Sequence, residues 1–204
     1  MATKGNSICK WCRREGVSLC GRERCAVKRR NYAPGVHGND KKQPKLSGYA
    51  RQLREKQKAK RLYLILERQF RRYFALARGR KGNTAETLVQ LLERRMDNAV
   101  YRLGLAKTRR QARQMVGHGF FTVNGKALTI PSYLVCVGDV LAVKETKRGK
   151  TLTREAGEAA VKARPPKWLS FDAASLSGKM VSLPEKEDLE TVFDPTLIVE
   201  LYSR

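Results

Sequence analysis

Four of the chain's five cysteines lie within seventeen residues near its beginning. Cys9 and Cys12 have C-x-x-C spacing, and Cys20 and Cys25 follow with C-x4-C spacing. Thiols spaced in this way in a reducing compartment are typical metal ligands. The rest of residues 1–46 is rich in turn-forming glycine and proline and has no obvious apolar core. A folded structure in this segment therefore needs a cross-link, which a bound metal would provide.

Tetrahedral sulfur ligation fits either zinc or an iron–sulfur cluster. We expect one Zn²⁺ held by Cys9, Cys12, Cys20 and Cys25, with the iron–sulfur cluster as the alternative. Because protein ligands would fill all four positions, such a zinc is structural and not catalytic. Unliganded cysteines or a redox pair remain a third interpretation. Cys136 stands apart between two valines and is expected to be a small buried hydrophobic residue.

The charge of the chain is strongly positive and unevenly distributed. Lys and Arg number 43 against 19 Asp and Glu, a formal net charge of +24. Residues 1–61 carry 18 basic and 4 acidic residues, residues 62–150 carry 18 and 6, and residues 151–204 carry 7 and 9. Such an excess indicates a polyanionic partner, and nucleic acid binding should weaken steeply with salt. We expect residues 168–204 to face a protein neighbour, although internal pairing of their acidic residues is an equal explanation.

The chain has no stretch approaching the roughly 20 apolar residues of a membrane span. Its N-terminus also lacks the apolar core of a signal peptide, because Lys10, Arg13 and Arg14 come too early. We therefore expect a cytoplasmic protein with no membrane partner.

Helical periodicity is prominent before position 104. The first expected helix runs from a Ser47 cap to about Tyr63, and the second lies near 67–77 with a core-facing apolar stripe. A capping box at Asn83 opens the third helix, whose apolar face continues to Leu103.

The pattern changes after position 104. Thr108 starts another capped helix, and Asn124-Gly125 between β-prone runs predicts a hairpin over 120–129. A further strand is expected at 140–143. Residues 151–163 are expected to be helical, and short strand-like runs follow to Tyr202.

Cations gather on two of these expected helices. Arg51, Arg54, Lys58 and Arg61 fall within about one quadrant of the first helix. Because Glu55 is nearly its only acidic residue, we interpret these cations as phosphate contacts and not as a solvated face. On the helix after Thr108, three arginines lie beside the apolar side and are expected to face RNA together: Arg109, Arg110 and Arg113. His118 is equally well explained as an RNA contact or as a turn residue.

Five short motifs occur between Arg94 and Lys144: Arg95-Met96-Asp97-Asn98, Tyr101-Arg102-Leu103-Gly104, Thr108-Arg109-Arg110-Gln111-Ala112-Arg113-Gln114, Gly117-His118-Gly119 and Val123-Asn124-Gly125. This series resembles the S-four RNA-binding domain, which also occurs in pseudouridine synthases, tyrosyl-tRNA synthetases and a heat-shock RNA-binding protein. By itself the resemblance implies only RNA binding.

Further motifs extend over the rest of the chain: Arg13-Arg14-Glu15-Gly16, Pro34-Gly35-Val36-His37-Gly38, Tyr49-Ala50-Arg51-Gln52-Leu53-Arg54-Glu55-Lys56-Gln57-Lys58, Glu67-Arg68-Gln69-Phe70, Trp168-Leu169-Ser170 and Tyr202-Ser203-Arg204. With them, essentially the whole chain resembles the bacterial small-subunit ribosomal protein S-four family. The resemblance implies a structural protein of the small subunit that binds a multi-helix junction in the 5′ domain of 16S rRNA. It also implies protein S-five and mRNA near the entry channel as neighbours, and a contribution to decoding accuracy.

The expected fold is α+β, with helices packed on a small antiparallel sheet in an S-four-type domain. The expected parts are a metal knuckle and basic loop at 1–46, a helical rRNA-binding domain at 47–93 to which the tail 185–204 returns, and the S-four domain with its extension at 94–184. The candidate RNA-binding residues are Arg13, Arg14, Lys28, Arg29, Arg30, Tyr49, Arg51, Arg54, Lys56, Lys58, Arg61, Arg109, Arg110, Gln111, Arg113 and His118.

Two other classes of protein are alternatives to the ribosomal one. An RNA-modifying enzyme would need a further catalytic domain, and the sequence has no P-loop, Ser/His/Asp arrangement or open metal site. A zinc-containing DNA-binding regulator would need a recognition helix near the knuckle, whereas the strongest basic helices lie downstream. We therefore predict a protein that is not an enzyme.

Overall fold

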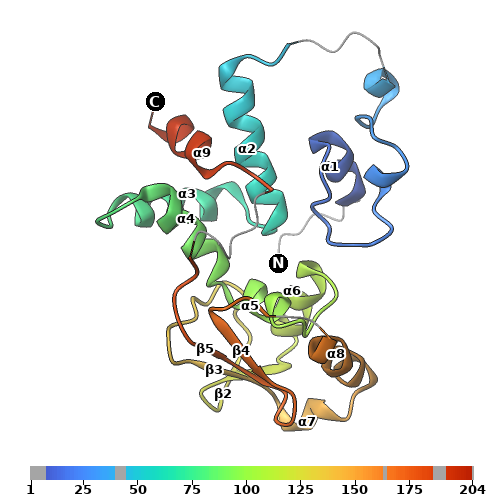
Figure 1. Ribbon diagram of the computed structural model, residues 1–204, viewed down its shortest axis with the longest axis vertical. Helices are drawn as coiled ribbons and strands as arrows, with labels where there is room; N and C mark the ends of the chain where they lie inside the picture. Colours follow the sequence, from blue (N-terminus) through green and yellow to red (C-terminus); the bar gives the residue numbers. More distant parts are fainter. Residues whose placement is uncertain (1–7, 40–44, 163–164, 186–191, 204) are drawn as a thin grey trace. The chain divides into compact units, whose positions relative to one another are not determined.

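The computed structural model describes residues 8–39, 45–162, 165–185 and 192–203. The chain divides into two compact units, residues 1–89 with 190–204 and residues 90–189. Figure 1 shows helices in the first unit, and helices with an antiparallel sheet in the second. The predicted α+β class is thereby confirmed. No helix of the described ranges is long and apolar enough to cross a membrane.

The first unit is helical. It contains α1 (Ile8–Glu15), two short 3₁₀ turns (Ala26–Lys28 and Val36–Asn39), α2 (Gly48–Leu62), α3 (Glu67–Arg78), most of α4 (Thr84–Glu93) and α9 (Pro195–Tyr202). Helix α2 begins as predicted at Ser47, whose Oγ accepts a hydrogen bond from the Ala50 N–H at 3.2 Å. The predicted apolar stripe of α3 is buried, which confirms that this face belongs to the core.

The end of the chain packs on this helical unit. Helix α9 lies against α2, and the Tyr202 ring stacks on Phe74 with 4.7 Å between ring centroids. The expected strand-like runs are wrong here, because residues 195–202 form a helix. Pro195 occupies its first turn, and the Asp194 carboxylate caps it by accepting the Thr196 N–H at 2.8 Å. Proline and an aspartate cap at these positions favour a helix start.

The second unit packs helices on a five-stranded sheet. Its helices are α5 (Met96–Arg102), α6 (Arg109–Gly117), α7 (Glu145–Arg148) and α8 (Thr151–Lys162), and its strands are β1 (Phe121–Val123), β2 (Lys126–Leu128), β3 (Val140–Val143), β4 (Leu169–Asp172) and β5 (Ser177–Met180). The strand order is β2-β1-β3-β5-β4, and every pair is antiparallel. Apolar side chains of α5, α6 and the sheet form one core around the fully buried Trp168.

Two local predictions for this unit have different outcomes. The Asn124-Gly125 hairpin is confirmed, since both residues have positive φ (49° and 79°) and Phe121 pairs with Leu128. The single helix to Leu103 is wrong, because it breaks between α4 and α5. Arg95 is extended at the break and forms a β-bridge with Leu134. The apolar periodicity of the sequence continues through Arg95, so it gives no sign that the β-bridge to Leu134 interrupts the helix.

Candidate nucleic-acid interface and cysteine cluster

Three of the four predicted metal ligands come together at the N-terminus. The Sγ atoms of Cys12, Cys20 and Cys25 lie within 4.8 Å of one another, and all three residues are buried. The Leu19 N–H donates a hydrogen bond to the Cys12 Sγ at 3.3 Å. Burial, together with the neighbouring Cys20 and Cys25, raises the pKa of Cys12 to about 12. A compact buried group of soft sulfur donors fits zinc or an iron–sulfur centre.

The remaining two cysteines lie elsewhere. Cys9 is half-buried one turn before Cys12, on a helix where the sequence predicted only a knuckle and loop. It does not join the group of three among the described residues. The expectation that Cys136 is buried is wrong. The loop before β3 exposes Cys136, and its Sγ lies 3.6 Å from an Arg94 guanidinium nitrogen.

Acidic residues from other elements pair with the cations of α2. Glu15 of α1, whose side chain is 1% exposed, pairs with Arg54 at 3.4 Å and also with Arg61. Glu67 of α3 accepts hydrogen bonds from Lys56 at 3.0 Å and Lys60 at 2.7 Å. The premise that this helix lacks acidic partners is therefore wrong, because tertiary packing supplies them.

The pairing of Glu67 perturbs its titration. Burial alone would raise the pKa of Glu67, but hydrogen bonds from Lys60, Tyr202 and Lys56 outweigh it and lower the pKa to about 2. The Tyr202 hydroxyl donates to Glu67 at 2.8 Å, so this carboxylate connects α2, α3 and α9. Lys58 is paired within its own helix, to Glu55 at 2.6 Å. Much of the positive charge on α2 is thus used inside the unit.

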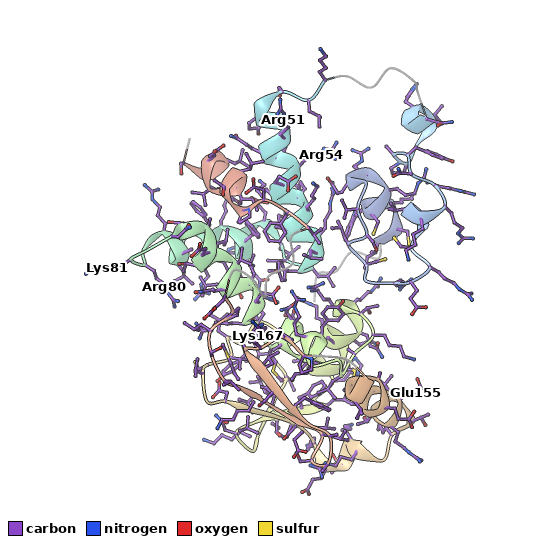
Figure 2. All side chains as sticks on the ribbon, viewed as in Figure 1. Arg51, Arg54, Arg80, Lys81, Glu155 and Lys167 are labelled. Atoms are coloured by element: carbon purple, nitrogen blue, oxygen red, sulfur yellow. The ribbon has the colours of Figure 1, made fainter. Side chains whose placement is uncertain are left out.

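The start of α2 is exposed. Arg51 lies near the N-terminal end and is exposed, whereas Arg54, one turn further, is the partner of Glu15 (Figure 2). The Tyr49 side chain is 55% exposed. An exposed aromatic ring next to an arginine suits contact with a nucleotide, because the ring can stack on a base and the guanidinium can bind a phosphate.

The three arginines of α6 do not share one exposed face. Arg109 is buried, donates to the Asn98 Oδ1 at 2.8 Å and lies over the Tyr101 ring. Arg113 pairs with Asp97 at 3.1 Å. Of the three, Arg110 is exposed. The expectation that the helix presents all three to RNA is therefore corrected for Arg109, which has an internal role.

The other residues predicted around α6 are accessible to different degrees. His118 is exposed at the end of the helix. Gln111 is partly buried, and its Oε1 accepts a hydrogen bond from the Lys107 N–H at 2.9 Å. The Gln111 N–H in turn donates to the Thr108 Oγ1, so the predicted cap is present.

A further cationic surface was not predicted. The face of α3 opposite its apolar stripe and the turn that follows carry exposed Arg68, Arg71, Arg72, Arg78, Arg80 and Lys81, the last two at the α3–α4 turn in Figure 2. Arg71 lies 3.7 Å from Glu67, a loose pairing at a side chain that is 72% exposed. The periodicity that identified the core side of this helix also placed its arginines on the opposite side. That signal was available in the sequence.

The N-terminal segment places its predicted cations around the cysteine cluster. Arg14, Lys28, Arg29 and Arg30 are exposed, and Arg13 is partly buried. The Arg13 Nε and Nη2 donate to the carbonyls of Tyr32 and Ala33 at 3.0 and 3.2 Å. The guanidinium also lies 4.5 Å from the Tyr32 ring centroid, so Arg13 joins α1 to the following loop.

A basic helical unit followed by helices on a small antiparallel sheet defines a protein of the S4-domain class. The model of the S4 domain matches residues 94–141, and that of the ribosomal protein S4/S9 N-terminal domain matches residues 4–93. The chain is 54% identical to the small ribosomal subunit protein uS4 of Acetivibrio thermocellus, with both chains covered completely. It is 52% identical to uS4 of Caldicellulosiruptor saccharolyticus over 96% of each chain, and 49% identical to uS4A of Alkaliphilus oremlandii over the whole of both. The chain belongs to the uS4 family of small ribosomal subunit proteins.

Proposed function

We propose that this protein is a structural constituent of the small ribosomal subunit in the bacterial cytoplasm, and that it binds 16S rRNA without catalysing a reaction. The full-length similarity to proteins named small ribosomal subunit protein uS4 carries this proposal. Exposed cations support it, since those on α3 and in the segment 28–30 outnumber the nearby acidic residues.

Within the subunit, the protein binds a multi-helix junction of the 5′ domain early in assembly and contributes to translational accuracy. Its protein neighbours include S-five, and mRNA passes near it at the entry channel. The RNA contacts include Tyr49, Arg51 and Arg110, whose exposure leaves them accessible to a ligand. The electrostatic potential around α2 also depends on Arg54, Lys56, Lys58 and Arg61, each of which is paired with a glutamate.

The cysteine cluster holds one structural zinc, with Cys12, Cys20 and Cys25 as three ligands and Cys9 as the fourth. The three grouped thiols are buried, and with Cys9 as the fourth ligand no position stays open for a substrate, so the metal would stabilise α1 and the segment around it. An iron–sulfur cluster is the alternative. Metal analysis of the purified protein should find about one zinc per chain, whereas two or more irons with visible absorbance would indicate the cluster.

The function is tested by following the native protein through ribosome fractionation and by measuring its binding to a 16S 5′-domain RNA fragment. We expect cofractionation with small subunits, protection of the junction from chemical probes and a steep loss of affinity with salt. A protein that stays in the soluble fraction and modifies RNA, or that prefers duplex DNA, would overturn the proposal.

A further inference from the structure

A cavity of about 470 Å³ lies beside the cysteine cluster. Its walls are formed by Cys9, Lys10, Arg13, Ala26, Arg29 and Arg30. Four of these six residues are cationic and none is acidic. The volume falls within the roughly 300–1,000 Å³ of ligand pockets, so the cavity has room for more than a single small ion.

The main chain around the cavity is held in place by local contacts. Arg29 and Arg30 follow a 3₁₀ turn in which both of their N–H groups donate to the Ala26 carbonyl, at 3.2 and 2.8 Å. Arg13, which also lines the cavity, is held by its hydrogen bonds to the carbonyls of Tyr32 and Ala33. A site whose cations already sit on ordered backbone loses less conformational entropy when a ligand binds.

The cavity cations differ from those of α2 in their pairing. Lys10, Arg29 and Arg30 are exposed, and none forms an ion pair with an acidic residue in the ranges that the structure describes. By contrast, Arg54 and Arg61 are paired with Glu15 in the same unit. The positive charge at the cavity is therefore available to an anion from outside.

Compensation of the thiolates is the competing explanation for these cations. A zinc ion with four thiolates is doubly negative, whereas four cations line the cavity. Two positive charges thus exceed what the metal centre needs. Because the guanidinium fork binds phosphate oxygens in pairs and a lysine adds a point charge, the combination matches a phosphate group.

We propose that this cavity binds one phosphate group of the RNA backbone and so fixes a single position of the rRNA on the N-terminal segment. The proposal rests on the proposed rRNA binding and deepens it. Cys9 and Ala26, which follows Cys25, line the same cavity, so the proposed phosphate site adjoins the cysteines.

The test compares two double variants of the full chain, Arg29→Ala/Arg30→Ala and Arg22→Ala/Arg24→Ala. Both remove two exposed arginines from the same segment, but Arg22 and Arg24 do not line the cavity. Phosphate-ethylation interference on the 16S 5′-domain fragment identifies the phosphates that each protein needs. We expect the cavity variant to lose interference at one phosphate or two adjacent ones, with affinity reduced about tenfold or more, as for loss of charge-assisted hydrogen bonds.

The control variant should keep the complete interference pattern and lose only a few-fold in affinity. An unchanged pattern in the cavity variant, or an equal loss in both variants, would overturn the phosphate site. Circular dichroism and metal content must match between the two. If the cavity variant does not fold, Lys10→Gln gives the same readout with one charge removed.

Further outcomes distinguish RNA phosphate from a free anion, and failure of the cavity proposal from failure of the proposed function. Inorganic pyrophosphate could bind the cavity as tightly as the RNA fragment does, while neither variant loses an interference signal. That result would assign the cavity to a free anion and overturn the RNA assignment. A wild-type protein that did not bind the fragment at all would refute the proposed function. If the wild type bound the fragment and the cavity variant kept the same interference pattern, only the cavity proposal would be refuted.

Discussion

Glu67 connects three helices of the first unit. Its replacement by glutamine should make the free energy of unfolding of that unit less dependent on pH in the acidic range. The carboxylate accepts hydrogen bonds from Lys56, Lys60 and Tyr202, which belong to α2 and α9. Glutamine keeps the shape of the side chain but removes the charge to which two ammonium groups are directed. The Glu67→Gln variant therefore isolates the electrostatic part of this connection.

The magnitude follows from the lowered pKa. A decrease from 4.5 to about 2 corresponds to an upper bound of about 3.5 kcal/mol, at about 1.4 kcal/mol for each tenfold change in the acid constant. The side chain is 34% exposed, so solvent screening reduces this to about 1–2 kcal/mol. Because the folded pKa lies below the unfolded one, the contribution is fully present above about pH 4.5 and is lost as the pH falls toward 2.

The assay is urea unfolding of the wild type and Glu67→Gln between pH 7 and pH 2.5, with hydrogen exchange of residues 195–202 as a local probe of α9. We expect the variant to be less stable by about 1–2 kcal/mol at pH 7 and the difference to shrink steadily below pH 4.5. Glu23→Gln removes the same charge at an exposed position and serves as the control. A difference that stayed constant down to pH 2.5 would refute the role assigned to the Glu67 charge.

The remaining predictions concern the cysteine segment and the second unit. Removal of the metal with a zinc chelator should speed hydrogen exchange in residues 8–30 and leave the second unit unchanged; equal exchange with and without chelator would argue against a bound metal. Arg109→Ala should destabilise the second unit by about 1.5–3 kcal/mol, because it removes a charge-assisted hydrogen bond to the buried Asn98. Arg110→Ala should instead weaken rRNA binding and leave the melting temperature unchanged. Similar melting temperatures for the two variants would contradict a structural role for Arg109 and an RNA-binding role for Arg110. Gly178→Ala should cost about 1–3 kcal/mol, because the new Cβ would lie 2.5 Å from both Leu103 methyl carbons; adding Leu103→Val should recover part of the loss in thermal unfolding if that clash is the cause.

Local features of the sequence were sufficient for much of the secondary structure. Ser47, Asn83 and Thr108 begin or precede helices because their side chains accept main-chain N–H groups within three residues. Asn124-Gly125 forms its turn because both residues tolerate positive φ. Such preferences depend on neighbours along the chain and can be read without knowledge of the fold. Pro195 and Asp194 carried the same kind of signal for α9, although that helix was not predicted.

The four N-terminal cysteines show how much their spacing alone could predict. The spacing of four cysteines predicted one cluster, and folding brings Cys12, Cys20 and Cys25 within 4.8 Å. Because a helix and not a loop carries Cys9 and Cys12, it also decides how near Cys9 comes to the others. Spacing alone does not reveal that geometry.

Which cations remain available to RNA was decided by the tertiary structure. Charge composition established an excess of positive charge, and it indicated nucleic acid as the partner of the chain as a whole. Whether an individual cation is paired depends on residues that are distant in the sequence. Glu15 pairs with Arg61, 46 positions away, and Asn98 accepts a hydrogen bond from Arg109, 11 positions away. Electrostatic pairing and burial act over a few ångströms of space, whichever positions of the chain they join. For that reason the sequence by itself determined the net charge, the helix caps and the cysteine motif, whereas packing determined that Arg109 is buried and that the cations beside the cysteines line a cavity.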